Sequence, residues 1–350
     1  IDFDPDVFSE PQAITLENGE LLISSEVSIN GHGKELLTID GDNQSRVFTV
    51  DDGTDSTQAV SISGVTMING NGLSTLNNRR GGCVMSIEQL SIINSKVTGC
   101  STSDGGGVWS RYGSLVITAS EITDNFAINR GGGVYARGVP AFISNTTISG
   151  NNANRISEAG GGINTHSADL EITNSTISNN QIRNGTANAG GIFLIAGSAL
   201  TLVNSTVFNN GGIGIDPSGP VNISNSLIAG HVAGDCDFTQ INANSNNQNN
   251  MDSDGSCDVL ATNHRTVAEP LLGTLADNGG LTMTHRPLAG SPVIDSGDDF
   301  LCESADQRGE NRPQDGDLDG TPSCDIGAVE FIFLSDELIY KDGFDVFNCG

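Results

Sequence analysis

The segment Leu115-Val116-Ile117-Thr118-Ala119-Ser120-Glu121-Ile122 contains the pattern that decides the fold of this chain. Leu115 and Ile117 are two residues apart, and the next strongly apolar position, Ile122, follows five residues later. A period of two is typical of a β-strand with one buried face. The step of five residues indicates that the chain then turns a corner into a second strand.

This arrangement recurs along the chain. Copies of the motif Asn/Ala-Ser/Thr-x-Ile/Val start 25, 26, 29, 30 and 21 residues apart, at Asn94, Ala119, Asn145, Asn174, Asn204 and Asn225. The apolar pairs are Ile62 and Met67, Ile92 and Val97, Ile117 and Ile122, Ile143 and Ile148, Ile172 and Ile177, Leu202 and Val207, and Ile223 and Ile228. Such a period predicts stacked repeats. We expect an all-β fold, a right-handed, single-stranded parallel β-helix with about seven regular coils, each ~4.8 Å high.

Two further columns support stacking. Glycine clusters, which permit tight corners, precede a third strand in the coils that contain Gly105-Gly106-Gly107, Gly131-Gly132-Gly133, Gly160-Gly161-Gly162 and Gly190-Gly191. Three residues beyond the second apolar position, asparagines recur at Asn125, Asn151, Asn180 and Asn210, and Cys100 takes this place one coil earlier. Stacked amides hydrogen-bond along a solenoid axis, so we expect this column to be structural.

The regular coils divide the chain into five parts. Residues 1–59 are predicted to form an N-terminal cap with irregular opening coils, and residues 60–228 the regular β-helix. The Asn-rich residues 229–265 are predicted to be a loop excursion. Residues 266–335 form a closing segment and residues 336–350 a C-terminal tail. Both ends of a solenoid need caps because they expose unpaired strand edges.

Charge and hydropathy limit the partners. The chain has 15 Lys and Arg against 43 Asp and Glu, a net charge of −28. An acidic surface repels nucleic acids and anionic membranes and attracts cations. No apolar run is long enough to span a membrane. The opening residues lack the pattern of a signal peptide, and we expect that any such peptide has already been removed. We expect a secreted or cell-surface protein.

Seven cysteines fit that compartment, although buried thiols in a cytosolic protein are the alternative. None has CxxC spacing, which disfavours zinc and iron–sulfur sites. Proximity predicts the disulfides Cys83–Cys100, Cys236–Cys257 and Cys302–Cys324, and leaves Cys349 unpaired.

The two ends of the sequence resemble a family of secreted bacterial β-helix proteins. The opening motifs are Ile1-Asp2-Phe3-Asp4-Pro5, Ser28-Ile29-Asn30-Gly31 and Val47-Phe48. The closing motifs are Ser291-Pro292-Val293-Ile294-Asp295-Ser296-Gly297, Asp306-Gln307-Arg308-Gly309 and Cys324-Asp325-Ile326-Gly327-Ala328-Val329-Glu330. This is the choice-of-anchor group, which is related to polymorphic outer-membrane repeat proteins. The resemblance implies export and surface display, and it carries no catalytic residues.

One acidic run has the pattern of a calcium loop. Asp315, Asp317 and Asp319 alternate before Gly320, and Asp325 follows. Several converging oxygen ligands are what calcium prefers. The run departs from the EF-hand pattern because its twelfth position is Ile326. We expect a structural calcium ion here, with a solvated acidic turn as the alternative; Asp252-Ser253-Asp254-Gly255 is a shorter version of the pattern.

The strands after the glycine clusters predict a ligand-binding face. Period-two alternation points Trp109, Tyr135, Asn164 and Phe193 outward, and beside them Arg111, Arg137 and His166 form a second outward column. Aromatic faces suit sugar rings, and guanidinium groups suit carboxylates or sulfates. The alternative is that a loop covers these residues. The predicted ligand-binding residues are Trp109, Arg111, Tyr135, Arg137, His166 and Phe193.

These features favour a binding, adhesive or structural role over catalysis. The expected partners are cell-surface or extracellular glycans, or further copies of the chain. The alternative is a lyase or hydrolase of acidic polysaccharides. A lyase needs a cation and a base, for which Arg111, Arg137 and His166 are candidates, whereas a hydrolase needs paired carboxylates, and no acidic column is evident beside the aromatic residues. Parallel β-helices occur in such enzymes, but a fold alone confers no activity.

Overall fold

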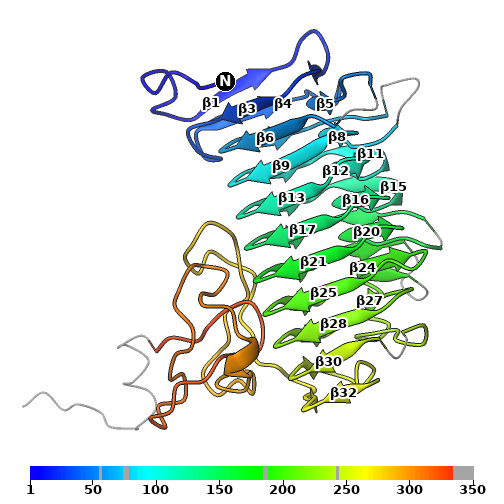
Figure 1. Cartoon of the computed structure of the whole chain (residues 1–350). Helices are drawn as coiled ribbons and strands as arrows, with labels where there is room; N and C mark the ends of the chain where they lie inside the picture. The colour runs from blue at the N-terminus through cyan, green and yellow to red at the C-terminus, as the bar shows by residue number, and fades with distance from the viewer. Residues whose placement is uncertain (55–56, 74–78, 156, 184–187, 242–243, 334–350) are drawn as a thin grey trace, which may run out of the picture.

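The computed structural model describes residues 1–54, 57–73, 79–155, 157–183, 188–241 and 244–333. Within these residues the strands form four parallel sheets, which we name sheets A, B, C and D. Successive turns of the chain add strands to sheets A, B and C in order, four of the middle turns also add a strand to sheet D, and the body is a rod-shaped β-helix (Figure 1). The predicted fold class is confirmed.

Sheet A contains β3 (Val27–Asn30), β6 (Ala59–Ser63), β9 (Gln89–Ile93), β13 (Leu115–Thr118), β17 (Ala141–Ser144), β21 (Leu170–Thr173), β25 (Leu200–Val203), β28 (Val221–Ser224), β30 (Asn246–Gln248) and β32 (Ala261–Thr262). Sheet B contains β1 (Gln12–Thr15), β4 (Leu37–Asp40), β7 (Thr66–Ile68), β10 (Lys96–Thr98), β14 (Glu121–Thr123), β18 (Thr147–Ser149), β22 (Thr176–Ser178), β26 (Thr206–Phe208), β29 (Leu227–Ala229), β31 (Met251–Asp252) and β33 (Arg265–Thr266). Sheet C contains β2 (Leu21–Ile23), β5 (Phe48–Val50), β8 (Val84–Ser86), β12 (Val108–Arg111), β16 (Val134–Arg137), β20 (Ile163–His166), β24 (Ala189–Ile195) and β27 (Ile213–Asp216). Sheet D contains β11 (Ser101–Asp104), β15 (Phe126–Arg130), β19 (Asn152–Ala153) and β23 (Gln181–Ile182), and one short 3₁₀ helix, η1 (Asp299–Leu301), follows in the closing segment.

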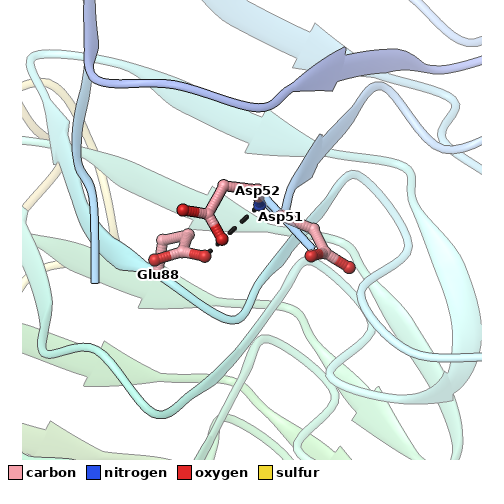
Figure 2. A group of neighbouring side chains, drawn as sticks. All are labelled: Asp51, Asp52 and Glu88. Atoms are coloured by element: carbon pink, nitrogen blue, oxygen red, sulfur yellow. Dashed lines mark hydrogen bonds between the residues drawn. The ribbon is translucent and has the colours of Figure 1, made fainter. Parts of the chain in front are cut away.

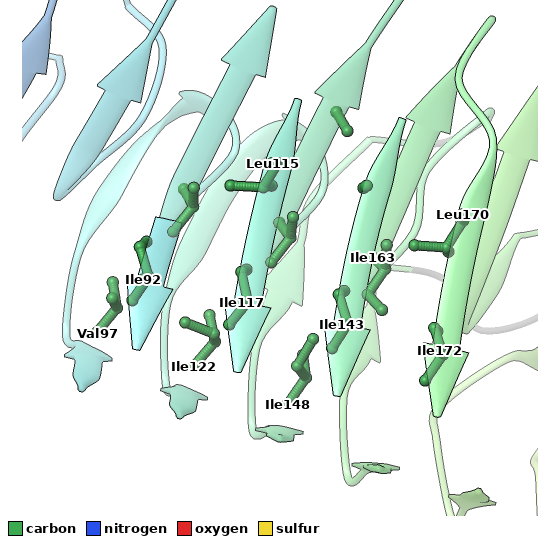
Figure 3. Packing of buried hydrophobic residues seen from close by; sticks show 14 of the residues in the cluster. Ile92, Val97, Leu115, Ile117, Ile122, Ile143, Ile148, Ile163, Leu170 and Ile172 are labelled. Atoms are coloured by element: carbon green, nitrogen blue, oxygen red, sulfur yellow. The ribbon is translucent and has the colours of Figure 1, made fainter. Parts of the chain in front are cut away.

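The core lies inside the rod and consists of stacked apolar columns (Figure 3). All the apolar pairs of the repeat are buried, and each residue stacks on its equivalent in the next turn, as Ile117 does on Ile143. The side chains of Ile122 and Ile148 approach the same interior from sheet B. The alternation read from the sequence therefore has the correct register.

The asparagine column forms a continuous hydrogen-bonded ladder. Asn125 Nδ2 donates to Asn151 Oδ1 at 3.0 Å, and Asn151 and Asn180 donate in the same way to the next turn at 2.9 Å. Each amide also donates to a backbone carbonyl, as Asn151 does to Ile122. The backbone N–H of Cys100 donates to Asn125 Oδ1, which places Cys100 one turn before the ladder as expected. The structural interpretation of this column is confirmed.

The three predicted disulfides are present, namely Cys83–Cys100, Cys236–Cys257 and Cys302–Cys324. Cys83–Cys100 joins the residue before β8 of sheet C to the residue before β11 of sheet D, and the two Cα atoms are 5.5 Å apart. Cys349 and the predicted tail at 336–350 lie outside the described residues.

The stack of turns extends beyond residues 60–228, to which the sequence repeat was assigned. Strands β1 to β5, in the predicted opening coils, pair in parallel register with the turns that follow, as β1 does with β4. Residues 229–265, which were predicted to be a loop excursion, also contain strands: β30 extends sheet A and β31 extends sheet B. This turn has polar interior side chains that are satisfied locally: Asn247 donates to the carbonyl of Cys257, and Asn250 donates to that of Ile223. The apolar alternation that marks the other turns is therefore absent here.

The closing segment lies along the flank of the rod beside sheet B (Figure 1). Gln307, which is buried, connects Thr147 and Thr176 of sheet B to Thr282 of the segment. Asn174 and Thr206 bond to the backbone of Ala305 and Ala328. Among the described residues, no helix has the length and apolar character that crossing a membrane requires.

Candidate functional site

The predicted ligand-binding residues lie in two neighbouring columns on sheet C. In the first, which we name the aromatic column, Trp109 pairs in register with Tyr135, Tyr135 with Asn164, and Asn164 with Phe193. In the second, the basic column, Arg111 pairs with Arg137 and Arg137 with His166. The alignment of adjacent turns is thus as the sequence predicts, and adjacent members are ~4.8 Å apart along the axis.

The exposure of the aromatic column differs from the prediction. Only 1% of the Trp109 surface and 2% of the Tyr135 surface is accessible. These rings form a small apolar cluster with Met85, separate from the core of the rod, and Phe193 is half-buried. The expected open aromatic face at Trp109 and Tyr135 is therefore wrong, and the alternative of a covered patch describes them.

The cover comes from the chain that leads into β12 and β16. Gly105 and Gly131 have φ values of 69° and 61°, and they fold the ends of β11 and β15 back onto the column. A Cβ atom on Gly105 would lie 2.8 Å from Trp109 Cβ, which leaves room only for glycine. The Arg80 guanidinium lies over the Trp109 ring, 4.9 Å from its centroid. Burial raises the pKa of Tyr135.

The basic column, in contrast, reaches solvent. Arg111, Arg137 and His166, together with Tyr112, line a hollow of about 210 Å³. Tyr112 is 61% exposed, and the Arg111 guanidinium lies 4.3 Å from its ring centroid. An open ring and two arginines thus remain available on sheet C after the aromatic column is covered. Sequence reasoning missed Tyr112 because it follows the strand, at a positive φ of 74°, and so lies outside the period-two pattern.

The electrostatics of the basic column are unusual for so acidic a protein. Within the described residues, neither Arg111 nor Arg137 forms an ion pair with an acidic side chain. Burial and the positive charges of Arg137 and Arg130 lower the pKa of His166, so its ring is neutral at pH 7. Its Nδ1 atom is buried and has no hydrogen-bond partner among the described residues. The column therefore offers two unpaired cations beside a neutral ring.

An acidic residue that the sequence pattern did not reveal continues the aromatic column. Asp216 pairs with Phe193 across a register shift in β24, and that shift hides the alignment in the sequence. Burial, assisted by the negative charge of Asp237, raises the pKa of Asp216 to about 7. The acidic residues near His166 in sequence are elsewhere: Glu171 is exposed on sheet A, and Asp169 accepts the backbone N–H of Ala199.

An aspartate from a distant part of the closing segment lies beside the predicted calcium loop. Oxygens of Asp295, Asp315 and Asp317 lie within 4.8 Å of one another. Asp315 Oδ1 is buried and has no hydrogen-bond partner among the described residues. Asp319 and Asp325 lie outside this group; Asp319 accepts the N–H of Thr321, and Asp325 accepts the N–H of Asp295 at 2.8 Å. These acidic groups could hold a metal ion.

Two other groups of acidic residues use their carboxylates to accept backbone N–H groups of nearby turns. Glu88 is buried, and its oxygens accept the backbone N–H groups of Asp52 and Gln58, while Asp51 lies beside them (Figure 2). In the second group, Asp235 accepts the N–H and hydroxyl of Ser253 near Asp252, and Asp254 Oδ2 accepts the N–H of Asp235. Each group holds a turn of the backbone.

The comparisons with known proteins address the fold. A family model described as "Right handed beta helix region" matches residues 53–266, which is more than half of the chain. No curated protein and no solved structure is significantly similar to the chain. The match covers sheets A to D from β6 to β33, and thus includes the basic column.

Proposed function

Because the chain belongs to the right-handed β-helix family, whose domain is found in polysaccharide lyases, hydrolases and adhesins, we propose that it is an extracellular protein that binds acidic glycans on sheet C. The observation that carries this proposal is the pair Arg111 and Arg137, stacked in register without an acidic partner among the described residues. Export is supported by the three disulfides, which persist in oxidising compartments.

Two arginines one turn apart repel each other, and a carboxylate or sulfate that bridges them removes this repulsion. Arg111 already stacks on Tyr112, so its guanidinium is oriented before a ligand arrives. The hollow of about 210 Å³ admits a single sugar ring with its acidic group rather than a folded polymer. With a net charge of −28, the protein repels polyanions at long range, so the attraction is local and the affinity modest.

The test is binding of galacturonate oligomers, measured by calorimetry. Arg111→Gln and Arg137→Gln should each weaken binding roughly tenfold, since each removes one charged hydrogen-bonding group. Arg183→Gln removes the same charge from an exposed site beside sheet D and should leave binding unchanged. Equal affinity in all four proteins would refute the proposal. Appearance of unsaturated sugar ends during the titration would instead support a lyase.

A structural calcium ion at Asp295, Asp315 and Asp317 is the second part of the proposal. Its support is the buried, unpartnered Oδ1 atom of Asp315 beside two further carboxylates. Calcium takes oxygen ligands, and binding to the folded state alone stabilises a protein by about 2.7 kcal/mol at a hundredfold excess over Kd. The ion would hold the loop 315–320 to the residues before η1.

Calorimetric melting with calcium and with a chelator tests this part. Calcium should raise the Tm by several degrees, and Asp315→Asn should abolish that rise because a neutral amide replaces the least satisfied ligand. Asp258→Asn, at an exposed position outside the acidic groups, is the matched control. An identical Tm of the unmodified protein in calcium and in chelator would rule out a structural ion.

A further inference from the structure

A hollow lies between the last turn of the rod and the closing segment. Its volume is about 480 Å³, within the range typical of ligand pockets. One wall is the corner Asn263-His264-Arg265 between β32 and β33, and the other is the segment 296–300 that leads into η1. We name it the Phe300 hollow. It is separate from the basic column and involves none of its residues.

Phe300 presents its side chain to solvent from a constrained turn. The residue is 98% exposed, which no other large apolar side chain among the described residues approaches. Its backbone is held firmly: Asp298 accepts the N–H of Phe300 at 2.9 Å, and Asp299 accepts the N–H of Cys324 at 2.8 Å. The disulfide Cys302–Cys324 follows directly. A fully exposed aromatic ring on a constrained turn is costly to hydrate and is a typical contact surface for a ligand.

The polar lining of the Phe300 hollow decides which ligand it suits. The rim carries both charges, because Arg265 and Asp298 both line it. Arg265 donates a hydrogen bond to Ser296 at 2.9 Å, and Asn249 donates one to Asp298 at 3.0 Å. The side chain of His264 is 3% exposed; its Nε2 atom lies 3.2 Å from Asp252, and its Nδ1 atom has no hydrogen-bond partner among the described residues. Completing the hydrogen bonding of this buried nitrogen takes an ordered water, and His264 itself forms part of the wall of the hollow.

We propose that the Phe300 hollow binds a neutral hexopyranose unit of a glycan. The apolar face of a sugar ring stacks on an aromatic ring, and its hydroxyl groups both donate and accept hydrogen bonds. The mixed rim agrees with such a ligand, because Asp298 and Asp299 repel an anion and Arg265 repels a cation. This site would act independently of the acidic-glycan site on sheet C.

The test is calorimetric titration of the whole protein with neutral hexaoses of glucose, mannose and galactose. Binding of at least one should weaken roughly tenfold in Phe300→Ala and persist in Phe300→Tyr, which keeps the ring. Phe142→Ala makes the same change at a 40% exposed position on sheet A and should have no effect. His264→Ala should also weaken binding, while Arg111→Gln should not.

The results that would overturn the proposal are equally defined. Either an absence of binding to all three hexaoses at millimolar concentration or an affinity unchanged by Phe300→Ala refutes it. A change in sedimentation of Phe300→Ala without any change in sugar binding would show that the ring contacts a second copy of the chain instead. Because Phe300 is almost wholly exposed, its truncation should leave the fold intact, and circular dichroism checks this.

Discussion

At the scale of single residues, a histidine completes the asparagine ladder after Asn210, its last member. His231 takes the place of the next asparagine: its Nδ1 accepts the N–H of Asn210 at 3.0 Å, and its Nε2 bonds to the carbonyl of Val207 at 3.2 Å. This requires the neutral ring with the proton on Nε2. Burial lowers the pKa of His231 to about 4.

His231 should therefore make the stability depend on pH. The unfolded chain takes up a proton near pH 6.5 and the folded chain only near pH 4. The contribution of the neutral ring is complete above pH 6.5 and is lost as the pH falls to 4, at a cost of up to about 3 kcal/mol. His231→Asn, which extends the ladder without titrating, should lack this loss.

Denaturant unfolding of both proteins between pH 7 and pH 4 measures the difference. Titrating carboxylates affect both proteins alike, so only the difference between them reports on His231. Parallel stability curves over this range would contradict the prediction.

At the scale of elements, each strand separates an inward from an outward face, and this determines which substitutions the rod tolerates. Ile117 is fully buried in β13 between its equivalents in the neighbouring turns, whereas Val116, next to it, points outward and is half-buried. The same alternation in sheet C places Trp109 outward, yet Gly105 and the Arg80 guanidinium cover it. Facing outward from a strand is thus not the same as being exposed.

Ile117→Asp should destabilise the rod by more than about 4 kcal/mol, because it buries a carboxylate without a partner. Val116→Asp introduces the same charge on the outward face and should cost less than about 1 kcal/mol. Unfolding in guanidinium, followed by circular dichroism, compares the two. Similar losses in both variants would mean that the inward and outward faces of β13 have been assigned wrongly.

At the scale of the whole molecule, the closing segment links distant turns. Gln307 Nε2 donates to Thr147 at 3.0 Å and to Thr282 at 2.9 Å, and Gln307 Oε1 accepts the hydroxyl of Thr176 at 2.6 Å. These bonds join two successive turns of sheet B to a segment more than a hundred residues away in sequence. A solenoid turn otherwise contacts only its neighbours, so this side chain couples the segment to the stability of the rod.

Gln307→Ala should loosen the closing segment while the sheets remain folded. It leaves the Thr176 hydroxyl without its acceptor, whereas the Thr147 and Thr282 hydroxyls lose the Gln307 donor but keep their bonds to the carbonyls of Met283 and Asn145. Each lost bond costs about 1 kcal/mol. Hydrogen exchange should accelerate in residues 282–284 and 305–309, and stay slow in β13 and β17. Gln314→Ala, which removes one exposed bond to the carbonyl of Asn311, is the control. Unchanged exchange in the closing segment would show that Gln307 does not hold it.

The repeat alone specified the β-helix, its buried columns and the asparagine ladder, and the short spacing of the cysteines specified the three disulfides. These features are local in a solenoid: each depends on residues of one turn and its neighbours, so a period in the sequence encodes them directly. Even the alignment of Trp109 with Tyr135 and of Arg111 with Arg137 followed from that period. The sequence did not predict the turn at 246–252 because its interior carries polar side chains, such as Asn247, that hydrogen-bond to nearby carbonyls in place of the apolar residues of the other turns.

Tertiary contacts decided which side chains are exposed on the surface and which of them lie close enough to form a site. The covering of Trp109 by Arg80, the approach of Asp295 to Asp315, and the position of Phe300 beside His264 each join segments that no period relates. Burial is a property of everything that packs around a residue, and a strand pattern reports only the side on which that residue lies. The candidate sites therefore became visible only once the chain had been folded onto itself.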